Sequence, residues 1–391
     1  MKILFFVSSM HAGGAERVAA TLASAWAKRG DTVILVPTYT GKGSCFYPLD
    51  PAVRLEWLAD RMGPTGRKAW PPLSKLRAIR NLVREVQPDV IVSFLTNVNV
   101  MVLLATKGLG VPVIACERTN PAFSNSAGKV LQFLRRKTYP WAAKVLMQSQ
   151  DGVQALKQMA RNVERLDVIP NPLPPGIDDY STQTQGSLNL VQAAAAPASA
   201  PLNYRKQVMA MGRMVPFKRF DALIAAFAAL AADYPDWDLT IWGDGPLRSD
   251  LEQQVQDVGL ASRIALPGRT SQPWQELARA DVFALTSQVE GFPNVLLEAM
   301  ALGCACITVD CPSGPREMSQ DGKDAVLIPL DNHDALVAGL GQLIDDATLR
   351  DTLGQRAAAT VRARYGLPQV LALWDALFAS VVTPVKQDGR T

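Results

Sequence analysis

Two glutamates, Glu290 and Glu298, bracket the run Glu-Gly-Phe-Pro-Asn-Val-Leu-Leu-Glu with seven residues between them. The run follows an apolar, strand-like stretch, residues 282–286, and continues into a helical segment, residues 296–302. A strand, a glycine turn and a helix start present backbone N–H groups and a positive dipole end to a phosphate. Glu290 then lies at the mouth of the turn, and Glu298 lies about two helical turns away. The segment is therefore predicted to bind the phosphate, sugar and ribose of a nucleotide-sugar. The alternative is a capped helix with two solvated carboxylates.

A pair of cations follows the first predicted strand of the second half of the chain. Gly212 and Arg213 end that strand, and Lys218 comes five residues after Arg213, before a predicted helix. Arginine as a forked donor and lysine as a point charge would neutralise a diphosphate without Mg²⁺. A solvated loop is the alternative interpretation.

Gly13 and Gly14 follow the first predicted strand and precede a helix over residues 15–28, with Glu16 in its first turn. Two glycines let a backbone approach a ligand closely and leave N–H groups directed outward. A tight turn without a ligand is an equally good interpretation. The dinucleotide fingerprint and the P-loop lysine are both absent from the sequence, which disfavours a dehydrogenase.

Two further turns follow predicted strands. Asp244, within Gly243-Asp244-Gly245-Pro246, is predicted to be an N-cap or turn residue first and a ligand contact second. Gly268 and Arg269 end another strand, at the edge where open sheets bind ligands.

The elements that position these residues alternate along the chain. Short apolar strands, such as residues 3–8, 32–37, 90–93 and 113–116, alternate with longer helical stretches. This alternation predicts an α/β fold of parallel sheets with crossover helices. The stretch 172–205 breaks the rhythm with prolines, polar residues and an alanine-rich run, and this composition predicts a linker or insertion.

The resulting division is into two doubly wound domains that face a cleft. Residues 1–171 form the predicted acceptor-binding domain, and residues 206–367 form the predicted nucleotide-sugar domain. A helix over residues 368–385 is expected to cross back over both domains, and the tail 386–391 is expected to be disordered.

Composition is ordinary for a soluble α/β enzyme, with 48% apolar and 19% charged residues in a chain of 391. No apolar run approaches the length that spans a bilayer, and the apolar start of the chain fits a buried strand better than a signal peptide. Five cysteines form an odd count without framework spacing, which indicates a reducing cytoplasm. Cys304 and Cys306 are interpreted as small buried strand residues, and no metal site is predicted.

Charge is distributed unequally. Residues 1–170 carry 23 Lys+Arg and 11 Asp+Glu, a net charge of +12, and the remaining 17 and 25 give −8. The basic half is expected to attract anionic surfaces or substrates. The chain lacks a basic and aromatic recognition motif of the usual kinds, so nucleic acid is not a predicted partner.

A basic helix in the first half suggests where such a partner binds. Lys129, Arg135, Arg136 and Lys137 surround apolar residues and lead into the aromatic run 139–141. An amphipathic basic helix with interfacial aromatics is predicted to contact an anionic lipid diphosphate or the membrane surface. The alternative is the solvated face of an ordinary helix.

Together these motifs resemble the retaining glycosyltransferases of family 4, whose two Rossmann-like domains form the GT-B fold. The resemblance covers nearly the whole chain except the insertion and the tail. Its most specific parts are Gly13-Gly14-Ala15-Glu16-Arg17, Gly212-Arg213 with Lys218, Gly243-Asp244-Gly245-Pro246, and Glu290-Gly291-Phe292-Pro293-Asn294 through Glu298. Residues 93–99, 117–121 and 310–315 are similar to the branch of amylovoran-type exopolysaccharide transferases and polyprenyl-diphosphate-glycan N-acetylgalactosaminyltransferases.

The resemblance implies roles for individual residues. Arg213 and Lys218 would hold the donor diphosphate, Glu298 the ribose hydroxyls and Glu290 the donor sugar, and the catalytic residues would be Glu290, Arg213 and Lys218. Backbone N–H groups over residues 292–295 would bind the distal phosphate. The expected donor-binding set is Gly13, Gly14, Gly212, Asp244, Gly268, Arg269, Phe292, Pro293, Asn294, Val295 and Glu298.

Arg118 stands where many family members have a histidine that faces the donor sugar. Three interpretations stay open, in which Arg118 binds the acceptor, binds the donor sugar or pairs with Glu117. The expected acceptor-binding set is Arg118, Asn120, Lys129, Arg135, Arg136 and Lys137.

The predicted function is a metal-independent retaining glycosyltransferase without a cofactor, which uses a nucleotide diphosphate sugar, most simply UDP-linked. Its predicted acceptor is a lipid-linked or cell-surface glycan, and its predicted place is the cytoplasm, peripheral on the inner face of the cytoplasmic membrane. In the same-face mechanism that the resemblance implies, the departing phosphate accepts the acceptor's proton, and no histidine base is needed. The alternatives are a catalytically weak nucleotide-sugar-binding homologue and an inverting or epimerising GT-B enzyme.

Overall fold

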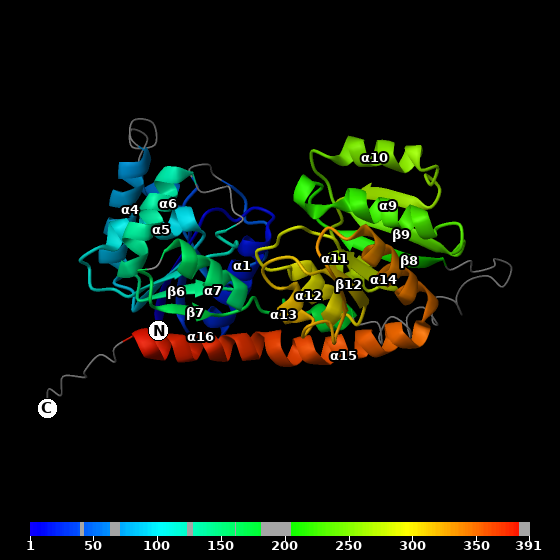
Figure 1. Cartoon of the computed structure of the whole chain (residues 1–391). Coiled ribbons are helices and arrows are strands. Elements are labelled where there is room, and N and C mark those ends of the chain that lie inside the picture. The colour runs from blue at the N-terminus through cyan, green and yellow to red at the C-terminus, as the bar shows by residue number, and fades with distance from the viewer. Residues whose placement is uncertain (40–42, 63–70, 123–127, 161, 181–204, 383–391) are drawn as a thin grey trace, which may run out of the picture. The chain divides into compact units, whose positions relative to one another are not determined.

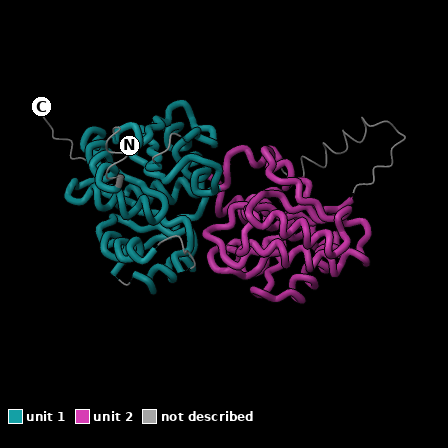
Figure 2. Tube along the Cα trace, turned by 90° about the horizontal axis from the view of Figure 1, so that it is seen from above, with its two compact units in different colours: residues 1–172, 368–391 teal, residues 173–367 magenta. Residues whose placement is uncertain are grey.

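The computed structural model describes residues 1–39, 43–62, 71–122, 128–160, 162–180 and 205–382. The chain divides into two compact units, which Figure 2 colours separately. Unit 1 consists of Met1–Pro172 together with Pro368–Thr391, and unit 2 consists of Leu173–Leu367. Residues 181–204 of the predicted linker and the whole predicted tail, 386–391, lie outside the described residues.

A seven-stranded parallel sheet forms the centre of unit 1, in the order β3-β2-β1-β4-β5-β6-β7. Figure 1 labels β6 and β7 of this sheet. Its strands are β1 (Lys2–Val7), β2 (Thr32–Pro37), β3 (Arg54–Leu55), β4 (Val90–Phe94), β5 (Val113–Cys116), β6 (Lys144–Met147) and β7 (Leu166–Val168). Its helices are α1 (Gly14–Lys28), α2 (Leu58–Arg61), α4 (Pro71–Val86), α5 (Thr96–Thr106), α6 (Lys129–Thr138), η1 (Tyr139–Trp141), α7 (Gln150–Met159) and the C-terminal α16 (Leu367–Val381).

Unit 2 contains a six-stranded parallel sheet in the order β10-β9-β8-β11-β12-β13. Its strands are β8 (Lys206–Met211), β9 (Trp237–Trp242), β10 (Ile264–Gly268), β11 (Val282–Leu285), β12 (Ala305–Val309) and β13 (Val326–Ile328). Its helices are η2 (Ile177–Tyr180), η3 (Pro216–Lys218), α9 (Phe220–Leu230), α10 (Arg248–Asp257), α11 (Pro273–Leu277), α12 (Asn294–Ala301), α13 (Pro315–Met318), α14 (His333–Asp345) and α15 (Ala347–Tyr365).

Each sheet has an apolar core on both faces, which explains why the strands read as near-continuous apolar runs. Leu4 and Phe5 are neighbours in β1, but they lie in different cores because successive side chains of a strand point to opposite faces. Val208 and Met209 of β8 divide in the same way between the two cores of unit 2. The prediction of two doubly wound parallel α/β domains is confirmed.

The strand order reverses once in each sheet. In unit 1, β1 pairs with β2 on one side and β4 on the other, and in unit 2, β8 pairs with β9 and β11. Ligands of open parallel sheets bind outside the carboxyl ends of the strands at such a reversal. A ligand-binding site is therefore expected at the loops that follow β1, β4, β8 and β11.

The C-terminal helix α16 packs on unit 1 through aromatic side chains. The rings of Trp374 and Phe378 lie 5.3 and 5.4 Å from the ring of Trp26 in α1, measured between ring centroids. The same two segments are also joined by an ion pair, with 2.5 Å between Arg29 Nη1 and Asp375 Oδ1. Unit 1 is therefore completed by a segment that follows all of unit 2 in the sequence.

Replacing Trp374 by alanine should destabilise unit 1 by about 3–5 kcal/mol, because the indole is 1% exposed and its removal leaves a cavity against Trp26. Hydrogen exchange should show faster exchange of α1 and β1 amides and unchanged protection in unit 2. Leu373→Ala is the matched control, since Leu373 is 44% exposed on the same helix. Unchanged protection of α1 in Trp374→Ala would contradict the assigned role.

Candidate functional site

The loops after β8 and β11 of unit 2 lie side by side and are joined by hydrogen bonds. Thr286 Oγ1 donates to the carbonyl oxygen of Lys218 at 2.9 Å, and the Gln288 amide donates to the carbonyl oxygen of Phe217 at 2.8 Å. Because β8 and β11 are adjacent parallel strands, both loops leave the same edge of the sheet. The topology thus unites motifs that are more than 60 residues apart in the sequence.

These loops bring Lys218 and Glu290 into direct contact. Lys218 Nζ lies 2.6 Å from Glu290 Oε1, and the two side chains are 15% and 10% exposed. The sequence predicted separate roles for them, one on the diphosphate and one on the donor sugar. In the structure each is the other's partner, so an incoming anion competes with Glu290 for the lysine.

Arg213, the other predicted cation, has an exposed side chain. Its guanidinium forms no ion pair or hydrogen bond with any residue that the structure describes. Its five N–H donors are therefore available to an anion at the same loop.

The glycines of this region are needed for contact between two loops. Gly243 has a φ of +138°, and a Cβ at this residue would lie 1.8 Å from the carbonyl oxygen of Gly212. At Gly245 a Cβ would lie 2.4 Å from the carbonyl oxygen of Met214. The backbone that these two glycines approach closely is thus the protein's own.

Asp244 lies in the loop after β9, before the turn at residues 246–247, and does not cap a helix. Its Oδ1 accepts a hydrogen bond from the Gly245 amide at 2.8 Å, whereas α10 begins at Arg248 after Leu247 as its N-cap. Asp244 Oδ2 also lies 3.7 Å from Nε of Arg269, whose side chain is 79% exposed. The predicted N-cap role of Asp244 is therefore wrong, and its predicted ligand contact stays a prediction.

Glu298 is buried within α12 and is held by a tryptophan. Only 2% of its surface is exposed, and its Oε2 accepts a hydrogen bond from Trp274 Nε1 at 3.0 Å. The ring of Tyr180 in turn meets the ring of Trp274, 6.0 Å away between centroids. The alternative of two solvated carboxylates is therefore wrong for Glu298 and for Glu290. Nothing in the local sequence singles out Trp274, since only the fold places its indole beside α12.

The start of α12 offers fewer free N–H groups than predicted. Pro293 has no amide hydrogen, and the backbone N–H of Asn294 donates to the carbonyl oxygen of Phe292 at 2.8 Å. The amides of Phe292 and Val295 form no hydrogen bond within the described residues. The predicted phosphate cradle over residues 292–295 is thus reduced to these two donors.

The paired glycines of unit 1 lie at its strand-order reversal. The Gly13 amide donates to Tyr47 Oη at 3.2 Å. Ser9 Oγ donates to Glu16 Oε1 at 2.9 Å, and a Cβ at Gly13 would lie 2.3 Å from Glu16 Oε2. Glu16 therefore folds back over the turn, and a side chain at position 13 would displace it.

A buried polar network surrounds Glu117, directly after β5. Its carboxylate accepts hydrogen bonds from Tyr139 Oη and from Thr96 Oγ1, the latter at 2.7 Å, and Arg135 Nη1 lies 3.9 Å away. Burial raises the pKa of Glu117 above its ordinary value. The cation nearest Glu117 is Arg135, so the interpretation that Arg118 pairs with Glu117 is wrong.

Arg118 is buried as well, with 8% of its surface exposed. Its Nη1 donates to Asn171 Oδ1 at 2.7 Å, and its guanidinium carbon lies 3.4 Å from the centroid of the Phe94 ring. Asn120, also predicted as an acceptor contact, is 4% exposed, and its Oδ1 accepts a hydrogen bond from the Ala122 amide at 3.0 Å.

The predicted basic helix is α6, and its basic residues divide between two faces. Arg136, Lys137 and Lys129 are exposed, as are the apolar side chains of Val130 and Phe133. Among the described residues, none of the helices combines the length and apolar character needed to cross a bilayer.

Arg135 and Tyr139 do not belong to that exposed surface. They are 2% and 1% exposed, and both contact Glu117. Residues four apart lie on the same side of a helical segment, and this side faces the interior of unit 1. The prediction that Arg135 meets an acceptor or membrane is wrong, and so is the interfacial role of Tyr139.

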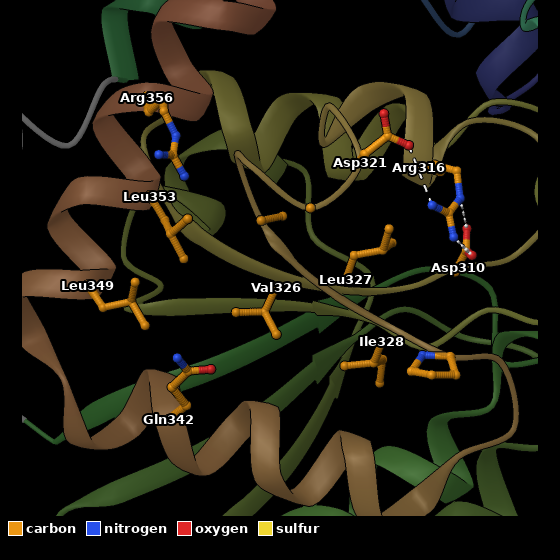
Figure 3. Close-up of a pocket in the computed structure, with 13 residues that line it drawn as sticks. Asp310, Arg316, Asp321, Val326, Leu327, Ile328, Gln342, Leu349, Leu353 and Arg356 are labelled. Atoms are coloured by element: carbon orange, nitrogen blue, oxygen red, sulfur yellow. Dashed lines mark hydrogen bonds and ion pairs between the residues drawn. The ribbon is translucent and has the colours of Figure 1, made fainter.

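A cavity of about 810 Å³ lies elsewhere in unit 2, along β13 (Figure 3). Its arginines are paired, Arg316 with Asp310 and Arg356 with Asp324, the latter at 2.9 Å. Its lining includes none of the predicted site residues. We therefore do not assign it to donor binding.

Two family models match the chain. The model described as Glycosyltransferase Family 4 matches residues 12–176, and the model described as Glycosyl transferases group 1 matches residues 195–360. Together they span residues 12–360 except 177–194, and they do not include α16.

Curated relatives are similar along the whole chain. The GalNAc-α-(1→4)-GalNAc-α-(1→3)-diNAcBac-PP-undecaprenol α-1,4-N-acetyl-D-galactosaminyltransferase of Campylobacter jejuni is 28% identical over 97% of this chain and 99% of its own length. The amylovoran biosynthesis glycosyltransferase AmsD of Erwinia amylovora is 26% identical over 96% of this chain and 98% of its own. An exopolysaccharide phosphotransferase of Streptomyces coelicolor is 26% identical over 98% of this chain, which spans only 41% of that relative.

Solved structures share the fold. Anabaena HepE in complex with UDP-glucose superposes with a TM-score of 0.78 at 21% identity, over 97% of this chain and 100% of HepE. A sucrose-phosphate synthase from Thermosynechococcus elongatus gives 0.78 at 18% identity, over 97% and 100%. The predicted GT-B fold is confirmed.

Replacing Arg135 by glutamine should destabilise unit 1 by about 3 kcal/mol, because it leaves the buried Glu117 carboxylate without its cation. The exposed neighbour Arg136→Gln is the matched control and should change the free energy of unfolding by less than about 0.5 kcal/mol. Urea denaturation measures both. Equal stability of the two variants would mean that Arg135 is not Glu117's effective partner.

Proposed function

Since the chain is a glycosyltransferase of the family 4 and group 1 type, we propose that it transfers a sugar from a UDP-linked donor to a lipid-linked or polysaccharide glycan with retention of anomeric configuration. In this proposal the reaction needs neither metal nor cofactor. The observation that carries the proposal is the contact between Lys218 and Glu290, 2.6 Å apart at the strand-order reversal of unit 2. The loop after β8 also carries Arg213, which has no ion pair within the described part of the chain.

Catalysis in this proposal is electrostatic. When the glycosidic bond to the donor phosphate breaks, negative charge grows on the departing diphosphate, and preorganised cations stabilise it. The diphosphate replaces Glu290 as the partner of Lys218, with Arg213 as a second cation. Glu290 is then free to accept a hydrogen bond from a hydroxyl of the donor sugar. The departing phosphate takes the proton of the attacking hydroxyl, so the site needs no separate base.

Glu298 is assigned to the ribose of the donor. A carboxylate that is 2% exposed binds hydroxyls well only if its orientation is set in advance, and the hydrogen bond from Trp274 sets it. The amides of Phe292 and Val295 at the start of α12 are assigned to the phosphate farther from the ribose.

Similar proteins support the donor and acceptor classes. HepE, whose fold similarity covers 97% of this chain, has been solved with UDP and with UDP-glucose. Two Campylobacter jejuni relatives act, by their names, on glycans linked to undecaprenol through a diphosphate. The net charge of +12 over residues 1–170 favours an anionic acceptor of this kind.

We assign the exposed part of α6 to contact with the anionic membrane surface on which such an acceptor lies. Val130 and Phe133 are 74% and 58% exposed, and Arg136 and Lys137 are exposed beside them. Apolar and basic side chains together are the pattern of interfacial helices. The proposed place of the enzyme is therefore the cytoplasmic face of the membrane.

Arg213→Ala and Lys218→Ala should each lower turnover by about 10²–10³-fold, because each removes a charge that stabilises the departing diphosphate. UDP release from a panel of UDP-sugars measures this, and NMR of the product gives its anomeric configuration. EDTA should leave the activity of the wild type intact. Activity that disappears in EDTA and returns with Mg²⁺ or Mn²⁺, or an inverted product, would sink the corresponding part of the proposal.

Glu290→Gln should mainly lower kcat, whereas Glu298→Gln should mainly raise the donor KM, because only Glu290 is placed at the reacting sugar. Trp274→Phe removes the indole donor but keeps an aromatic ring, and it should also raise the donor KM by about 5- to 10-fold, the value of one hydrogen bond. Steady-state kinetics with a fixed acceptor distinguishes these effects. A Trp274→Phe enzyme with wild-type donor KM would remove the argument for a preset Glu298.

A further inference from the structure

Arg118 is a buried cation without a counter-ion. It is 8% exposed, and no carboxylate forms an ion pair with it among the residues that the structure describes. Its one hydrogen bond there runs from Nη1 to Asn171 Oδ1, and its Nε has no hydrogen-bond partner among the same described residues. Burial lowers the pKa of this arginine to about 10. An uncompensated buried charge is costly, so its presence needs an explanation.

The surroundings of Arg118 come from four adjacent strands. Phe94 ends β4, Arg118 follows β5, Gln148 follows β6 and Asn171 follows β7, and these strands are neighbours in the sheet. All four residues therefore lie at the carboxyl edge of the sheet, where parallel α/β domains bind ligands.

The side chains around Arg118 hold it in one orientation. The guanidinium carbon lies 3.4 Å from the centroid of the Phe94 ring, so the arginine packs against that ring. Asn171 Oδ1 accepts hydrogen bonds from both Arg118 Nη1, at 2.7 Å, and Gln148 Nε2, at 2.8 Å. Gln148 and Asn171 are 5% and 2% exposed, which makes this a built, preorganised arrangement.

One edge of the Arg118 guanidinium remains available to a ligand. Nε and Nη2 form the forked edge that matches two oxygens of a carboxylate or phosphate, and neither makes a hydrogen bond to the described residues. We propose that Arg118, held by Phe94 and Asn171, is an oxyanion-binding residue of unit 1. Its ligand is a phosphate or carboxylate group of a substrate.

This inference rests on the proposed function and deepens it, because it requires one of the substrates to carry an anionic group that binds to unit 1. That group is either a phosphate of a lipid-diphosphate acceptor or the carboxylate of a uronic acid donor sugar. Both present the same pair of oxygens to the arginine.

The first test measures anion binding without turnover. In full-length protein, changing both Arg213 and Lys218 to glutamine removes the two cations proposed to bind a diphosphate in unit 2, and inorganic pyrophosphate should still raise the Tm of this variant by about 2–4 °C over sodium chloride of equal ionic strength. Adding Arg118→Gln should abolish that rise. Adding Lys157→Gln, which removes an exposed cation of unit 1, should preserve it. A rise that survives Arg118→Gln overturns the proposal.

The same variants separate a binding role from a structural one. If Arg118 is held in place for a ligand, Arg118→Gln without added anion should keep the wild-type Tm or raise it, since a buried uncompensated charge is removed. A lower Tm for both Arg118→Gln and the charge-conserving Arg118→Lys would mean that the arginine is a structural link between strands and would overturn the proposal.

The second test identifies the source of the anion. Arg118→Gln should lower kcat/KM by about 10- to 150-fold, the value of hydrogen bonds to a charged group, only for the substrate that supplies the oxyanion. The donor arm compares UDP-glucuronate with UDP-glucose, and the acceptor arm compares a glycan on undecaprenyl diphosphate with the same glycan on a neutral alkyl chain. Equal losses for charged and neutral members of both arms overturn the proposal. An enzyme that transfers no sugar at all would refute the proposed function while the pyrophosphate result still decides on Arg118.

Discussion

The ion pair between Lys218 and Glu290 is the interaction on which the proposed donor site of unit 2 depends. With 2.6 Å between Nζ and Oε1, and both side chains mostly buried, each charge satisfies the other in the absence of substrate. Two hydrogen bonds between the same loops keep this geometry. In the proposed reaction a diphosphate therefore replaces one anionic partner of Lys218 with another, and this lysine is compensated both before and after the substrate binds.

Glu117 and Arg118, two buried charged residues of unit 1, have different surroundings. Glu117 is surrounded by Tyr139, Thr96 and Arg135, and this network has the character of a structural core, since all of its donors come from the protein. Arg118, the next residue in the chain, receives only Asn171 and the face of Phe94. The side chains of adjacent residues diverge at the end of a strand, so one enters the packed interior and the other stays at the sheet edge.

The common frame is the parallel sheet, whose carboxyl edge collects residues that are far apart in the sequence. In unit 2 it brings the loops after β8 and β11 together, and in unit 1 it gathers residues after four consecutive strands. The close approach of the loops after β8 and β9 depends on Gly243 and Gly245, where no side chain would fit. Much of the glycine pattern that resembles a ligand motif is thus required by packing of the protein on itself.

The sequence alone determined the fold class, the two doubly wound domains and most strand positions. The reason is that the periodicity of apolar residues and the glycine turns are local properties of the sequence. Predicted strands 32–37 and 113–116 coincide with β2 and β5. The sequence also singled out Arg213, Lys218, Glu290 and Glu298 as candidate site residues, from their places in the loops and the helix that follow two strands. Only the tertiary structure decided which side chains meet. It paired Lys218 with Glu290, placed Trp274 on Glu298, buried Arg135 and left Arg118 without a counter-ion. These outcomes depend on contacts between distant segments and on which face of a helix turns inward, and neither is encoded in residue spacing.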